Sequence, residues 1–248
     1  MSLAQHLVEL RRRLFISAIA ILLFSVGGWF LADFVWDALR EPVLAIQKAH
    51  NATINYPDIT SAFDLKFQIS VTIGVVAASP VWLYELFAFL VPGLTRREKK
   101  YTFGFFFTAI PLFFAGCAAG WYVFPHIVEL LTSFVPKNDA SFIVARDYLS
   151  FVLKLVLAIG IAFVLPVFLV LLNFIGILSA KTIIKSWRGA VLIIFLFCAI
   201  ATPSVDVVSM FVLAVPMVLL YLGAALVAFL HDRGVARRAA TLEADPAV

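Results

Sequence analysis

Charged residues are scarce in this chain. Asp, Glu, Lys and Arg make up only 14% of its 248 residues, whereas 63% are hydrophobic and the mean hydropathy is +1.04. So little polar surface cannot cover a water-soluble globule, and the apolar runs are long enough to span a lipid bilayer. The composition therefore excludes a soluble fold and predicts an all-α integral membrane protein.

The sequence is also poor in residues that carry out chemistry. Its two cysteines, Cys117 and Cys198, lie in apolar segments without a neighbouring histidine or acidic residue, which is typical of small core hydrophobes. The four histidines are scattered over termini and loops. No catalytic triad, metalloprotease motif or paired intramembrane carboxylate occurs at a sensible spacing. We therefore expect no enzyme, no cofactor and no metal site.

The basic residues favour lipid over nucleic acid as their partner. The net charge is +4, but the cations form short clusters between apolar runs. Clusters of this kind are typical of juxtamembrane loops that meet anionic lipids. We therefore expect contacts with anionic lipids and no binding of nucleic acid.

Six apolar runs predict six transmembrane helices in residues 1–230, followed by a mobile charged tail in residues 231–248. The first run of 21 residues gives about 31 Å of helix, which matches a hydrocarbon core of about 30 Å. The fifth has only 13 residues and a very short connector to the sixth, so we expect short helices five and six in a shallow hairpin. The expected helices are residues 14–34, 67–91, 102–125, 148–175, 189–201 and 207–230.

The distribution of Lys and Arg predicts the orientation in the membrane. Of 19 such residues, 13 lie before the first run, after the second and fourth runs, and in the tail. Cytoplasmic loops carry an excess of these cations. We therefore expect a multi-pass protein of the cell membrane with both termini in the cytoplasm.

Prolines and glycines inside the runs predict how the helices pack. Proline removes a backbone donor and bends a helix, so the bundle should be curved. Gly116 and Gly120 form a GxxxG pattern that permits close approach of another helix. Internal packing is favoured over a docking face for another subunit. The prolines in question are Pro80, Pro111, Pro166 and Pro216.

Three acidic residues stand out beside the expected cytoplasmic face. Glu98 is a single carboxylate among four cations in residues 95–100, which is a candidate binding group although its neighbours can also neutralise it. Glu9 and Arg13 are spaced i, i+4 and can pair on one helix. Glu85 lies about two turns from the inner end of the second run, which predicts an interfacial or internally paired role.

Several segments together resemble the TatC family, the receptor subunit of the twin-arginine protein translocase. They occur in the order of that family and extend to about residue 230. The matching segments are HLVELRRRL at 6–14, SPVWLYELFAFLVPGLTRREKK at 79–100, YLSF at 148–151, GIAFVLPV at 160–167 and ATPSVDVVSM at 201–210.

The resemblance implies a six-span, glove-shaped protein that recognises Arg-Arg signal peptides at the cytoplasmic face. It also implies assembly with single-span TatA and TatB subunits and with other copies of the chain, to export folded proteins. The signal-binding positions of the family match Phe89, Glu98, Glu9 and Arg11.

Four further positions relate to the family pattern. Pro42 matches a proline of the first outer loop, and Asp206 matches an acid that follows the fifth helix. The chain departs from the family in the fourth helix, where Val164 and Leu165 stand and many members have Glu or Gln. A polar partner-binding role for that helix is not expected here.

Two other classes of protein fit parts of the pattern. Six spans with proline breaks could form the two three-helix repeats of a small multi-pass secondary transporter. However, the halves show no convincing repeat, and the polar midplane site that a carrier needs is missing. A membrane-embedded enzyme would need paired acids, bases or metal ligands, which the sequence lacks.

Overall fold

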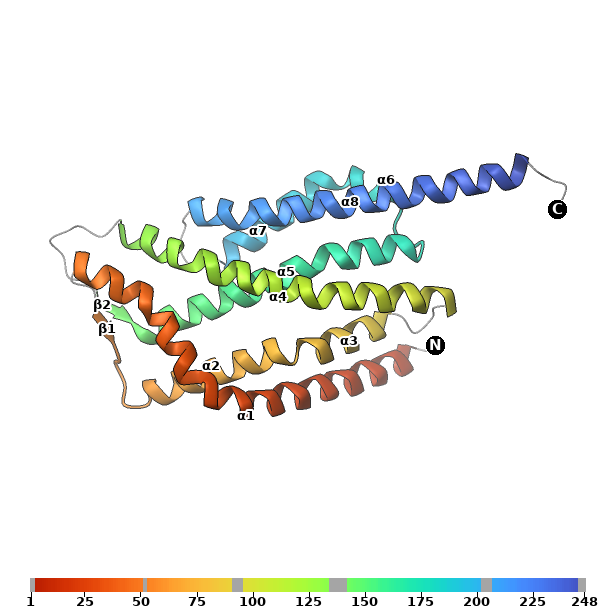
Figure 1. Cartoon of the computed structure of the whole chain (residues 1–248). Helices are drawn as coiled ribbons and strands as arrows, with labels where there is room; N and C mark the ends of the chain where they lie inside the picture. Colours follow the sequence, from red (N-terminus) through yellow and green to blue (C-terminus); the bar gives the residue numbers. More distant parts are fainter. Residues whose placement is uncertain (1–2, 51–52, 91–95, 134–141, 202–206, 245–248) are drawn as a thin grey trace.

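The structure is a computed structural model that describes residues 3–50, 53–90, 96–133, 142–201 and 207–244. These residues form long helices lying side by side and two short strands (Figure 1). The elements are α1 (Leu3–His50), β1 (Thr53–Asn55), α2 (Ser61–Ala77), α3 (Ser79–Leu90), α4 (Arg96–Ser133), β2 (Phe142–Val144), α5 (Ala145–Phe174), α6 (Ala180–Lys185), α7 (Trp187–Ala201) and α8 (Val207–Ala244).

The two ends of the bundle differ. One end, called the basic end here, holds the start of α1, the end of α3, the start of α4 and the end of α8 (Figure 1). The other, called the strand end, holds β1 and β2, which pair in parallel with Ile54 opposite Ile143. This pairing links the segment after α1 to the segment before α5.

The helices confirm an all-α integral membrane fold. Within the described residues, four helical segments are long and apolar enough to cross a membrane: Gln5–Leu44, Phe103–Glu129, Ala145–Phe174 and Leu213–Val235. The bent pair of α2 and α3 is a fifth candidate. The 15 residues of α7 give only about 22 Å of helix, so the expected short fifth helix is present while the count of six spans stays a prediction.

The second expected span is bent, as its proline predicts. The axes of α2 and α3 meet at 55°, with Ala78 between them and Pro80 in the first turn of α3. Proline lacks the backbone N–H that would continue the hydrogen-bond ladder. The bend changes the direction of α3 and so determines which helix its far end meets.

Several helix boundaries differ from the prediction, two of them with consequences for candidate residues. Helix α1 continues to His50, so Pro42 lies inside a helix and not in an outer loop. The extension is stabilised because Leu39 and Val43 are buried in the core and the Tyr148 hydroxyl donates to the Leu39 carbonyl at 2.6 Å. Helix α4 begins at Arg96, so the expected basic loop forms its first turns.

The sixth helix is long and not short, since α8 has 38 residues. It continues beyond residue 230 through a stretch rich in Ala and Arg, which are good helix formers. The expected mobility of residues 231–248 stays a prediction. The connector at residues 202–206, on which the shallow-hairpin prediction depends, lies outside the described residues.

Glycines bring α4 and α5 into close contact. A Cβ added at Gly116 would lie 2.9 Å from the Cα of Gly160, and one at Gly120 would lie 3.0 Å from the Cα of Val156. These contacts confirm that the GxxxG pattern serves internal packing. The two helices also contribute core residues, Phe113 from α4 and Leu149 and Leu155 from α5.

Candidate functional site

Arg13 joins the first and third helices at the basic end. Its Nε and Nη2 donate to Oε1 of Glu9 at 3.1 and 2.7 Å, and its Nη1 donates to Oε2 of Glu85 at 2.8 Å. The Arg13 and Glu9 side chains are 23% exposed and that of Glu85 is 12% exposed. Both the predicted i, i+4 pair and the predicted internal pairing of Glu85 are confirmed.

A second contact joins α1 and α3 about one helical turn closer to the start of α1 and the end of α3. The rings of His6 and Phe89 are stacked with centroids 4.3 Å apart and planes inclined by 22°. His6, Glu9 and Arg13 are spaced i, i+3, i+7 on α1, and Glu85 and Phe89 are spaced i, i+4 on α3, so each set shares one helix face. We call these five residues the α1–α3 contact.

The α1–α3 contact can bind a further cation. It contains two carboxylates and one guanidinium, so its formal charge is −1 if His6 is neutral. Arg13 engages one oxygen of each carboxylate, and among the described residues the structure shows no partner for Oε2 of Glu9 or Oε1 of Glu85. Because the side chains are partly sheltered from water, an ion pair made there is stronger than an exposed one.

The remaining predicted residues lie around or away from this contact. Arg11 is exposed on α1. Glu98 lies in the first turn of α4, but its side chain is outside the part that the structure describes, as is the whole of Asp206. Pro42 is half-buried near the far end of α1 and so takes no part in the α1–α3 contact.

His6 was not predicted from the sequence as a member of the site. Its i, i+3 spacing to Glu9 places both residues on one helix face, and this spacing is the signal in the sequence that could have revealed it. A polar cluster where α5, α6 and α8 meet was not predicted either. There Asp232 accepts from the backbone N–H of Ala180 at 2.7 Å and from Nδ2 of Asn173 at 2.9 Å.

The structure offers no sign of a metal centre in the residues it describes, since no three His, Cys, Asp or Glu side chains are grouped there to hold an ion.

The two residues that depart from the family pattern lie on α5. Val164 is buried, whereas Leu165 is half-exposed.

Comparison with known proteins identifies the family. The profile described as Sec-independent protein translocase protein (TatC) matches residues 5–216, which include the whole α1–α3 contact. The chain belongs to the TatC family. It is therefore a multi-pass membrane protein of the twin-arginine protein transport system, and the family consists of translocase components and not of catalysts.

Several TatC proteins are similar to the chain over nearly its whole length. The TatC of Xylanimonas cellulosilytica is 43% identical over 242 residues, covering 97% of this chain and 88% of that protein. The TatC of Rothia mucilaginosa is 37% identical over 245 residues, covering 98% and 84%. The crystal structure of the twin arginine translocase receptor TatC in DDM aligns with a TM-score of 0.78 at 32% identity, covering 90% of this chain and 99% of that one.

Proposed function

We propose that this TatC-family chain is the receptor that recognises twin-arginine signal peptides at its basic end. The basic end then faces the cytoplasm with both termini, as the distribution of Lys and Arg predicts. The chain acts with other copies of itself and with single-span TatA and TatB subunits to export folded proteins across the cytoplasmic membrane. Family membership and the chemistry of the α1–α3 contact support this proposal.

The observation that supports arginine recognition is that the α1–α3 contact already binds a guanidinium. Glu9 and Glu85 hold Arg13 at 2.7 and 2.8 Å in a partly sheltered position. An exposed ion pair contributes only about 0–1 kcal/mol, whereas a charge-assisted bond in a sheltered site contributes about 1.5–3 kcal/mol. The carboxylate oxygens that Arg13 does not engage can accept from a signal-peptide arginine, whose planar fork suits a carboxylate better than lysine does.

Three further residues complete the proposed site. Phe89 presents an aromatic ring that stacks on His6 and can equally take a guanidinium on its face. Glu98, in the first turn of α4, is proposed to bind the second arginine of the signal. Arg11, exposed on α1, belongs to the amino-terminal motif of the same site. The roles of Pro42 and Asp206 stay predictions from the family resemblance.

Photocrosslinking tests the proposal. A photoreactive amino acid placed at Phe89 or at Glu98 should crosslink to a precursor that carries Arg-Arg and much less to one that carries Lys-Lys. The same amino acid at Ile59, which is fully exposed at the start of α2, serves as the control and should give no crosslink.

Substitutions sharpen the test. Glu98→Lys should abolish crosslinking from Phe89 while the protein stays inserted and folded, because a reversed charge repels both arginines. Phe89→Ala, probed from Glu98, should weaken crosslinking to the Arg-Arg and Lys-Lys precursors alike, since it removes apolar contact. Wild-type crosslinking yield in Glu98→Lys would remove Glu98 from the proposed site.

A further inference from the structure

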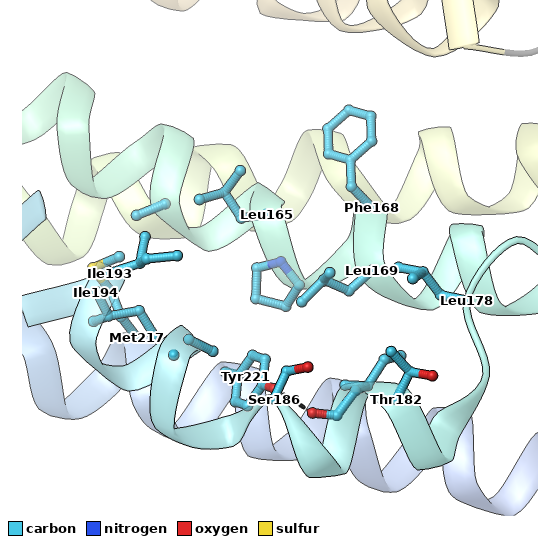
Figure 2. A pocket seen from close by; sticks show the side chains of 15 residues that line it. Leu165, Phe168, Leu169, Leu178, Thr182, Ser186, Ile193, Ile194, Met217 and Tyr221 are labelled. Atoms are coloured by element: carbon cyan, nitrogen blue, oxygen red, sulfur yellow. Dashed lines mark hydrogen bonds between the residues drawn. The ribbon is translucent and has the colours of Figure 1, made fainter.

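An apolar cavity of about 510 Å³ opens between α5, α6, α7 and α8, and no residue of the α1–α3 contact lines it (Figure 2). Its volume lies in the range of about 300–1,000 Å³ that is typical of ligand pockets. Aliphatic and aromatic side chains form most of its wall. Prominent among them are Leu165 and Leu169 of α5, Ile193 and Ile194 of α7, and Met217 and Tyr221 of α8.

One part of the wall is polar. Thr182 in α6 and Ser186 at its C-terminal cap are spaced i, i+4 and line the cavity (Figure 2). Two of the three hydroxyls on this part have partners within the protein: Oγ1 of Thr182 lies 2.9 Å from Oγ of Ser179, and the Tyr221 hydroxyl donates to the backbone carbonyl of Ile183 at 2.6 Å. The cavity is thus apolar along most of its wall, with two hydroxyls from a single turn of chain.

Three cations lie on the same short stretch of chain as these hydroxyls. Lys181, Lys185 and Arg188 are all exposed, and residues 180–189 contain no acidic residue. Asp232, which lies next to α6, already accepts bonds from Ala180 and Asn173 through its two carboxylate oxygens. The hydroxyl-lined part of the cavity therefore favours an anion.

The shape and chemistry of the cavity restrict its occupant. A helix with its side chains is about 10–12 Å in diameter and rises about 5.4 Å per turn, so a cavity of about 510 Å³ holds roughly one turn and is too small to seat a helix. Water would find too few polar partners along these walls, and an extended peptide would leave its backbone groups unsatisfied. An acyl chain carries no polar atoms and fits an apolar space between helices at lipid depth.

We propose that the cavity binds one acyl chain of an anionic phospholipid. The phosphate of the lipid lies against the hydroxyls of Thr182 and Ser186 and the charges of Lys185 and Arg188. The lipid comes from the leaflet that meets the basic end, and it fills the space between α5 and the short helix α7. This site does not depend on signal-peptide recognition.

Native mass spectrometry of the full-length chain in detergent tests the proposal. The protein is titrated with phosphatidylglycerol and, separately, with phosphatidylcholine that has the same acyl chains. Wild-type protein should retain one phosphatidylglycerol molecule in preference to phosphatidylcholine. Lys185→Gln with Arg188→Gln should lower the affinity for phosphatidylglycerol about tenfold and remove the preference, because a cation near the headgroup adds to the attraction.

A second variant tests the acyl-chain part of the site. Ala190 lines the cavity, so Ala190→Trp should fill it and abolish the retained lipid. Ala199→Trp is the matched control, because Ala199 is exposed on the same helix and does not line the cavity. Arg12→Gln with Arg233→Gln removes the same charge from exposed positions elsewhere and should leave lipid binding unchanged.

Three results would overturn the lipid site. They are equal retention of phosphatidylcholine by wild-type protein, unchanged lipid retention in Ala190→Trp, and equal losses of affinity in the two charge variants. The charge variants change exposed residues only, so they test the headgroup site even if Ala190→Trp fails to fold. Signal-peptide crosslinking from Phe89 is expected to persist in all of these variants that fold.

Discussion

Arg13 holds together two carboxylates that would otherwise repel each other. Glu9 and Glu85 are 76 positions apart in the chain, yet both bond to the same guanidinium. Like charges brought this close in a sheltered place are unfavourable unless a cation lies between them. Arg13 and the His6–Phe89 stack therefore both hold α3 against α1, and the proposed recognition site depends on that position.

Replacing Arg13 should destabilise the protein. Arg13→Gln leaves both carboxylates without their cation, and we expect a loss of about 1–3 kcal/mol in the free energy of unfolding. Thermal unfolding in detergent measures it. Arg12→Gln is the control, because Arg12 is the exposed neighbour and should change stability by less than about 0.5 kcal/mol. Equal melting temperatures for the two variants would show that the ion pairs contribute nothing.

At the scale of elements, the contact of α4 with α5 depends on the absence of side chains. A Cβ at Gly116 would lie 2.9 Å from both the Gly160 Cα and the Ile159 carbonyl oxygen. Backbone atoms cannot rotate away as the end of a side chain can. The two helices would have to separate, which would loosen the core around Phe113 and Leu155.

Gly116→Ala should therefore lower the free energy of unfolding by about 1–3 kcal/mol, the usual cost of overpacking a core. Gly104→Ala is a matched control on the same helix, where an added Cβ meets nothing within 4 Å. That control should be neutral or stabilising by up to about 1 kcal/mol, because alanine has less freedom than glycine in the unfolded chain. Comparison of the two melting temperatures tests the packing, and a stable Gly116→Ala protein would contradict it.

These elements also show how far the sequence predicts the structure. The Glu9–Arg13 pair, the bend near Pro80 and the GxxxG contact were predictable because each depends on spacing within one segment. The stacking of His6 on Phe89 and the pairing of Arg13 with Glu85 were not, since both depend on the 55° angle between α2 and α3. The extension of α1 to His50 was missed because it is held by burial of Leu39 and by Tyr148, far away in sequence.

At the scale of the whole molecule, the two ends have different chemistry. The strand end carries a two-stranded pairing and an ion pair in which Lys66 Nζ lies 2.7 Å from Oδ2 of Asp33 and 5.2 Å from the Trp29 ring. The basic end carries the α1–α3 contact, and α6 with the exposed cations of residues 181–188 lies in the half of the bundle nearer to that end (Figure 1). Both proposed binding sites, for signal peptides and for lipid, require the basic end to meet the inner leaflet.

Cysteine labelling in whole cells tests this orientation. Ile59→Cys, at the strand end, should react from outside with a membrane-impermeant maleimide, because Ile59 is fully exposed. Lys185→Cys, in α6, should react only after the membrane is permeabilised. The native Cys117 and Cys198 are buried, so the unmodified chain provides the background. Labelling of Lys185→Cys in intact cells would place the cations of α6 outside, and the proposed receptor function would then lack access to precursors made in the cytoplasm.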